Sequence, residues 1–171
     1  MIFNEYLATL IQDKNISDLG RAADMLWLSI GEPHIIEIEY TGKKKSKEVS
    51  EFAIHFQCQW RFVKGGEILL ASCDIYNPYA PELEYKDEWD WDIFGREKEQ
   101  SSIFDVRRLE LKENYLPLKI KNACISSTND LRIDFENGVY FETFINCSRK
   151  YEYYRFIDFI NGEHIVVFDE L

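Results

Sequence analysis

The sequence predicts an α+β fold in which two helices pack on a predominantly antiparallel β-sheet. Several stretches of the 171-residue chain alternate apolar and polar side chains with a period of two, which is typical of strands with one buried face. Aromatic residues make up 15% of the chain, a share that favours a β-rich core. Glycine-containing turns separate many of these stretches, so we expect neighbouring strands to pair as hairpins.

Length and charge narrow the class of protein. A chain of 171 residues suits one domain over residues 1–171. The net charge of −11 argues against nucleic-acid binding, which needs clustered lysine and arginine. We expect no membrane span and no signal peptide, because long apolar runs and a basic start are missing from the sequence. The four cysteines form no CxxC motif, which predicts reduced thiols, a cytoplasmic protein, and neither metal nor other cofactor.

The first part of the chain predicts a helix followed by strands. Residues 3–11 carry an apolar stripe at helical spacing. Residues 24–30 form an apolar run that we interpret as a buried strand, with a helix as the alternative. Between them, residues 19–21 are interpreted as a turn. Residues 34–40 alternate again, and the lysine-rich stretch 41–45 is expected to be a solvated loop.

The longest alternation, from Phe52 to Val63, predicts one strand with aromatic residues on its buried face. Gly65-Gly66 then returns the chain as a second strand over residues 68–73. A two-residue turn would place Phe62 opposite Leu69, Trp60 opposite Ala71 and Cys58 opposite Cys73.

The second half predicts another helix and more hairpins. Ser101 or Ser102 caps a helix with Phe104, Val106, Leu109 and Leu111 as its apolar residues, and strands follow at 118–126, 131–135, 139–145, 153–159 and 164–168. In the hairpin around Asn137-Gly138, a three-residue loop keeps one face apolar, because it places Ile133 opposite Phe141.

Two segments resemble each other. Trp60-Arg61-Phe62 and Tyr154-Arg155-Phe156 each precede a Gly-Glu turn and an aliphatic strand. A duplicated helix-plus-sheet unit, with halves 1–80 and 101–171 around an acidic loop at 81–100, would explain this, and so would chance combined with shared hairpin chemistry.

The best candidate for a binding site is the acidic segment Glu88, Trp89, Asp90, Trp91 and Asp92. Tryptophan is a leading hot-spot residue at interfaces, and the neighbouring carboxylates would steer a basic partner toward it. The alternative is that both tryptophans fold back onto the sheet and anchor a long loop.

A second candidate is a small-ligand pocket formed by His55, Arg61 and Arg155. It would require these three side chains to converge, and an enzyme of unrecognised type could use such a pocket. The ordinary interpretation is an exposed strand histidine and two surface arginines.

The chain also resembles a group of small bacterial proteins. The similarity rests on Asp24-Met25-Leu26-Trp27-Leu28 and on the hairpin Leu131-x-Ile133-x-Phe135-x-Asn137-Gly138-x-x-Phe141-x-x-Phe144, followed by Tyr154-Arg155-Phe156. Some of these uncharacterised proteins are grouped with immunity proteins that neutralise secreted toxins, and the resemblance implies no catalytic residues.

We therefore expect a non-enzymatic, cytoplasmic protein-binding protein of the immunity type that blocks a basic partner such as a toxin. The pocket at His55, Arg61 and Arg155 is the main alternative. An assembly role through an exposed sheet edge is a third.

Overall fold

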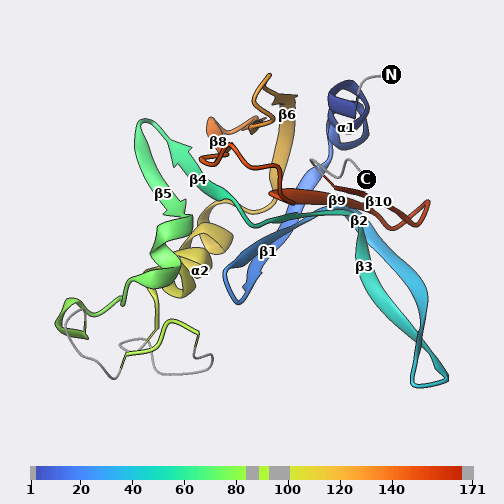
Figure 1. The fold of residues 1–171 in the computed structure, drawn as a ribbon, viewed down its shortest axis with the longest axis horizontal. Coiled ribbons are helices and arrows are strands. Elements are labelled where there is room, and N and C mark those ends of the chain that lie inside the picture. Colours follow the sequence, from blue (N-terminus) through green and yellow to red (C-terminus); the bar gives the residue numbers. More distant parts are fainter. Residues whose placement is uncertain (1–2, 84–88, 93–100, 167–171) are drawn as a thin grey trace.

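The computed structural model describes residues 3–83, 89–92 and 101–166 (Figure 1). Within these ranges lie two α-helices, two 3-10 helices and ten strands. They are α1 (Phe3–Ile11), β1 (Asn15–Ala22), β2 (Met25–Tyr40), β3 (Lys43–Phe56), β4 (Gln59–Lys64), β5 (Glu67–Ala71), the 3-10 helices η1 (Ser72–Tyr76) and η2 (Pro81–Leu83), α2 (Ile103–Tyr115), β6 (Leu118–Ile125), β7 (Leu131–Phe135), β8 (Val139–Phe144), β9 (Tyr154–Asp158) and β10 (Glu163–Val166).

The strands form one antiparallel sheet in the order β10-β9-β3-β2-β1-β6-β7-β8-β4-β5. The predicted class, an α+β fold with two helices and a mostly antiparallel sheet, is therefore confirmed. At the centre, β1 and β6 share only the pairs Asn15 with Lys119 and Ile16 with Leu118. The order has an internal symmetry. If each strand is replaced by the one five places away in number, so that β1 exchanges with β6 and β5 with β10, the same order is obtained when read from the opposite edge.

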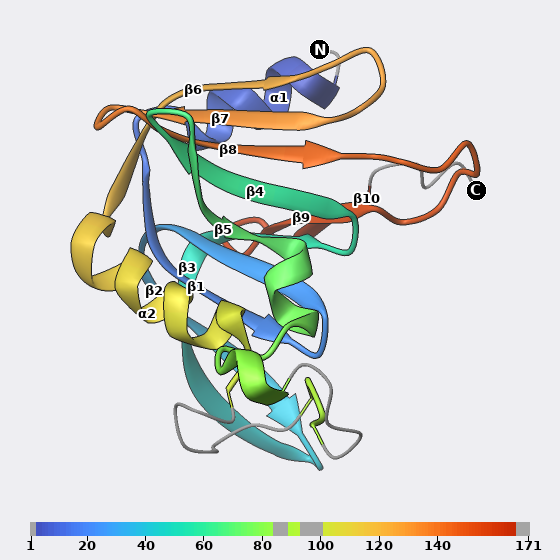
Figure 2. The same cartoon turned by 90° about the vertical axis from the view of Figure 1, so that its left-hand side faces the viewer.

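The sheet curls so that its two halves face each other around the core. The rings of Phe56 on β3 and Phe141 on β8 lie 4.9 Å apart, although their strands stand third and eighth in the sheet order. Phe62 packs on the same Phe141 ring at 4.8 Å. In Figure 2, β6, β7, β8 and β4 form the upper part of the molecule and β1 to β3 lie below. This curl lets one continuous sheet bury most of its aromatic residues without a second sheet.

The predicted single strand from Phe52 to Val63 is wrong, because the chain crosses between layers at Gln57-Cys58. β3 ends before these residues and pairs with β9, whereas β4 starts after them and pairs with β8. The backbone amides of Gln57 and Cys58 both donate to the carbonyl of Tyr153, at 2.8 and 3.1 Å. Within this stretch, even-numbered residues are buried on both strands, so the apolar alternation continues across the crossing. The sequence pattern therefore does not reveal where one strand ends and the next begins.

The hairpin of β4 and β5 starts in the predicted register and then departs from it. Lys64 faces Glu67, but a register shift between Phe62 and Val63 places Phe62 opposite Leu70. A β-bulge adds one residue to one strand and so moves every later pair. Cys58 and Cys73 are consequently not opposite each other, and the four cysteines are free.

The hairpin of β7 and β8 has the predicted register. Ile133 faces Phe141, and Gly138 adopts a φ of 80° at the loop end. The predicted cap of α2 is also confirmed, because the Asp105 amide donates to Ser102 Oγ at 3.2 Å. Leu109, one of the apolar residues of the predicted helix, is exposed instead. On β6, a register shift precedes Cys124, which is also exposed.

The predicted turn at residues 19–21 and the predicted loop at 41–45 are both corrected. Gly20 and Arg21 belong to β1, and the turn follows at Ala23, which has a φ of 52°. Lys43, Lys44 and Lys45 belong to β3, so the turn there is limited to residues 41–42. In both places glycine or lysine lies in a strand, because cross-strand pairing outweighs the low β-propensity of these residues.

Candidate partner-binding segment

The acidic segment is described from Trp89 to Asp92, and Glu88 lies outside the described residues. Trp91 is half-buried and packs against the core, with its ring centroid 5.1 Å from that of Tyr76 in an edge contact. Asp90 and Asp92 are exposed, and the Asp92 amide donates to Asp90 Oδ1 at 3.0 Å. The segment is thus a short turn that packs one indole against the core and exposes two aspartates.

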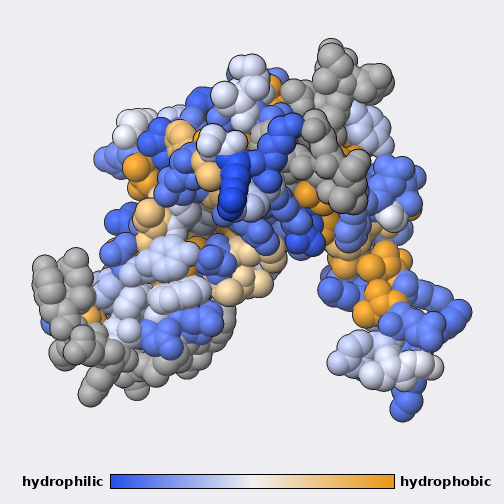
Figure 3. Space-filling model, viewed as in Figure 1, coloured by the Kyte–Doolittle hydropathy of each residue, from blue (hydrophilic) through white to orange (hydrophobic). Residues whose placement is uncertain are grey.

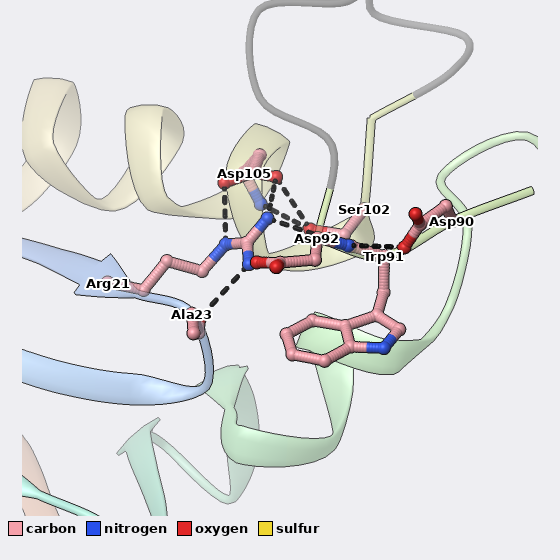
Figure 4. A network of polar contacts seen from close by, with 7 residues as sticks. All are labelled: Arg21, Ala23, Asp90, Trp91, Asp92, Ser102 and Asp105. Atoms are coloured by element: carbon pink, nitrogen blue, oxygen red, sulfur yellow. Dashed lines mark hydrogen bonds and ion pairs between the residues drawn. The ribbon is translucent and has the colours of Figure 1, made fainter.

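A buried arginine attaches this segment to the body (Figure 4). The Arg21 side chain, at the end of β1, is only 2% exposed. Its guanidinium donates to the Trp91 carbonyl at 2.9 Å and to the Ala23 carbonyl at 3.0 Å. It also donates to both carboxylate oxygens of Asp105, from Nε at 3.2 Å and from Nη2 at 3.0 Å. One planar group therefore joins β1, α2 and the acidic segment.

Asp105 is held ready for this contact by the start of α2. It lies in the first turn of the helix, where the helix dipole favours a negative charge. The Ser102 hydroxyl donates to Asp105 Oδ2 at 2.9 Å. Burial opposes ionisation of Asp105, but the hydrogen bonds from Arg21 and Ser102 prevail and lower its pKa below the ordinary value of 3.8. The carboxylate consequently stays charged opposite Arg21 at neutral pH.

This geometry gives the members of the segment different roles. The packing of Trp91 matches the alternative in which a tryptophan folds back and anchors the loop. Trp89 is half-buried, and Asp90 and Asp92 face solvent. The exposed carboxylates of Asp90 and Asp92, beside the partly exposed indole of Trp89, can bind an ammonium or guanidinium group of another molecule.

Sequence reasoning did not identify Arg21 or Asp105. Arg21 lies in the predicted turn at residues 19–21. Its neighbours in the sequence, Gly20 and Ala22, are not polar, so nothing next to it in the chain indicates an ion pair. Asp105 is the third residue after the cap Ser102, and an acidic residue there is a known helix-start signal. That signal indicates a cap and does not reveal a long-range partner.

The second candidate site is only partly assembled. His55 on β3 and Arg155 on β9 are cross-strand neighbours. Burial lowers the pKa of His55, and the charges of Arg155 and His164 lower it further. Arg61 lies on β4 in the other half of the sheet, with its Nη2 2.6 Å from Glu142. Two of the three predicted residues therefore meet, and the third lies elsewhere in an ion pair of its own.

Over residues 3–83, 89–92 and 101–166, no group of three or more His, Cys, Asp or Glu side chains is placed to hold a metal ion. In the same ranges no helix has the length and apolar character needed to cross a membrane. No protein-family model, curated protein or solved structure matches this chain.

Proposed function

We propose that this is a non-enzymatic protein-binding protein of the immunity type, which blocks a basic partner such as a toxin. The observation that carries the proposal is the attachment of the acidic segment. A buried arginine, Arg21, holds the backbone of a peripheral segment in place while Asp90 and Asp92 remain exposed. Holding a peripheral turn in this way orders its carboxylates before a partner arrives, which reduces the entropy lost on binding.

The proposed mechanism is occlusion driven by charge. A net charge of −11 attracts a basic protein over long range and raises its association rate. At short range, Asp90 and Asp92 would pair with lysine or arginine, and Trp89 would supply apolar area. Trp91 has a positioning role in this scheme, because its ring packs on Tyr76 and the core.

The test is a pull-down from lysate of the source cell at low and high salt, with two matched baits. One bait is the double variant Asp90→Asn/Asp92→Asn. The control is Glu110→Gln/Glu113→Gln, which removes the same charge from exposed positions on α2. We expect one basic partner that is released by salt and retained less by the first variant than by the control. Equal retention by both variants would contradict the assigned site, and no partner in either buffer would contradict the function.

A small anionic ligand at His55 and Arg155 is the second candidate, supported by their adjacency on neighbouring strands. Thermal shift with a metabolite panel tests it, with His55→Ala and Arg155→Ala as comparison variants. A ligand that stabilises the unaltered protein and neither variant would support this function. Uniform melting across the panel would count against it.

We also infer that the chain consists of two similar halves, 1–80 and 101–171. Support comes from the strand order, which is unchanged when β1 to β5 are exchanged with β6 to β10. Arg61 on β4 faces Glu142 on β8, and Arg155 on β9 faces His55 on β3, so the two similar sequence segments occupy equivalent places. Each half then gives its last hairpin to the other. Separately expressed halves should fold only when mixed, and a cooperative thermal transition in either half alone would oppose the exchange.

A further inference from the structure

The hairpin of β2 and β3 continues well beyond the sheet. We call residues 33–50 the arm; it extends at the lower right of Figure 1. β1 pairs with β2 only as far as Ile30, and β9 pairs with β3 only from Phe52 onward. Within the part of the chain that the structure describes, the two strands of the arm therefore pair only with each other. An isolated two-stranded ribbon is only marginally stable in water, and an additional strand or a partner surface would stabilise it.

The arm exposes large apolar side chains. Ile35 is 69% exposed, Tyr40 is 64% exposed and Ile38 is 37% exposed. Figure 3 shows hydrophobic side chains on the arm, at the lower right, among hydrophilic ones. Exposed apolar residues that cluster on one projecting element are typical of a surface that a partner covers.

Cross-strand pairing separates the charges of the arm onto its two faces. On one face, Ile36, Ile38 and Tyr40 of β2 lie opposite Lys47, Lys45 and Lys43 of β3. On the other face, Ile35, Glu37 and Glu39 lie opposite Glu48, Ser46 and Lys44. The first face carries three lysines and no acid. The second carries three glutamates and one lysine, so it has an excess of negative charge.

The two outer edges of the arm differ in how well they are protected. Edge strands are commonly guarded by lysine, which opposes the addition of another strand. The edge formed by β3 carries Lys43, Lys44, Lys45 and Lys47, whereas β2 has no lysine between Pro33 and Tyr40. The edge of β2 therefore presents main-chain groups next to apolar side chains and two glutamates.

We propose that the free edge of β2, residues 33–40, accepts an extended segment of the basic partner as an additional strand. The basic character of that partner rests on the proposed function. In this arrangement main-chain hydrogen bonds supply affinity, and alternate side chains supply specificity. Residues of the added strand on the Ile36, Ile38 and Tyr40 face would be apolar. Those on the Glu37 and Glu39 face would be lysine or arginine, because opposite charges stabilise cross-strand pairs.

The charge pattern also selects the register of the added strand. A shift by one residue would move its basic side chains to the face that already carries three lysines, and its apolar side chains beside Glu37 and Glu39. The segment that fits best is thus one in which basic and apolar residues alternate.

A peptide titration tests this inference. The probe is a synthetic seven-residue peptide in which lysine alternates with valine, added to the ¹⁵N-labelled full chain. We expect its binding to shift the amide resonances of residues 34–40 and to leave those of 43–50 in place. A glutamate–valine peptide and a lysine–valine peptide with methylated backbone nitrogens should not bind. Shifts confined to β3, or equal binding of the methylated peptide, would overturn the proposal.

Two matched variants separate strand addition from general attraction to an acidic protein. Glu37→Lys/Glu39→Lys should weaken the lysine–valine peptide about tenfold or more. Glu110→Lys/Glu113→Lys makes the same charge change on α2 and should leave the affinity within about twofold. An equal loss in both variants would overturn the proposal. All these side chains are exposed, so both variants should keep the dispersed spectrum of the folded protein.

Sedimentation of the chain without peptide adds a further outcome. A dimer in which residues 33–40 change on dilution would mean that a second copy occupies the edge, which overturns the basic partner as occupant. The inference and the proposed function can fail separately. If a peptide binds β2 but no basic partner is captured from lysate, the proposed function is refuted and strand addition is not. If a basic partner is captured but its binding leaves the resonances of residues 34–40 unshifted, strand addition is refuted and the proposed function is not.

Discussion

Replacing Arg21 by methionine should destabilise the protein far more than a typical surface change. The substitution keeps an apolar stem near Phe104 but removes the charge, the bidentate contact with Asp105, and the bonds to the carbonyls of Ala23 and Trp91. Breaking a fully buried ion pair costs about 3–5 kcal/mol. The Asp105 side chain is 25% exposed and keeps its bond to Ser102, so we expect a loss of about 2–3 kcal/mol.

Thermal and urea unfolding measure this loss, which corresponds to a lower Tm by roughly 4–12 °C for a chain of this length. Arg155→Met is the matched control, because Arg155 is a more exposed arginine that pairs with Glu152 three residues earlier. That change should cost no more than about 1 kcal/mol. A loss below about 1 kcal/mol for Arg21→Met, or equal losses in both variants, would refute the view that the buried guanidinium organises this region.

The same pair determines part of the acid sensitivity. Because the folded-state pKa of Asp105 is lowered, its contribution to stability is present above its ordinary pKa of 3.8 and is lost as pH falls through the lower folded-state pKa. The stability difference between the unaltered protein and Arg21→Met should therefore shrink below about pH 3.8 in urea titrations, and a difference that stays constant from pH 6 to pH 2 would argue against the ion pair. Gly20→Ala should lose about 1–3 kcal/mol in thermal unfolding, because its Cβ would lie 2.4 Å from Trp27 Cζ2; an unchanged Tm would show that the indole moves aside without cost. Phe141→Ala should lose about 3–5 kcal/mol in urea unfolding, since its ring contacts Phe62 and other core aromatics, and a loss under about 1 kcal/mol would mean that the curled sheet closes around the cavity. Burial raises the pKa of Cys58 to about 12, so a thiol reagent at pH 8 should label the three exposed cysteines quickly and Cys58 only after unfolding; fast labelling of all four would contradict the burial.

Local patterns in the sequence were sufficient for most of the individual elements. The cap at Ser102 and the register of Ile133 with Phe141 were predicted correctly, because both depend on residues only a few positions apart. The strand predicted from Phe52 to Val63 failed at its middle. A period of two reports that one face is buried and carries no information on which strand lies alongside.

The sequence singled out the candidate segment but did not indicate how it is attached to the rest of the molecule. Clustered tryptophan and aspartate identified residues 88–92, whereas the attachment through Arg21 depends on Asp105, which lies far away in the sequence. The pocket of His55, Arg61 and Arg155 illustrates the converse problem. The similar sequence contexts of the two arginines suggested convergence, but the strand order places β4 and β9 near opposite edges of the sheet.

The sequence by itself determined the fold class, the helix start at Ser102, the position of most strands and the strong acidity of the chain. These properties follow from side-chain periodicity, capping and composition, which act over a few residues. Only the tertiary structure decided the strand order, the burial of Arg21 and the separation of charge on the arm. Each of these depends on pairing between distant segments, where many arrangements satisfy the same alternation and the packing of the whole chain selects one.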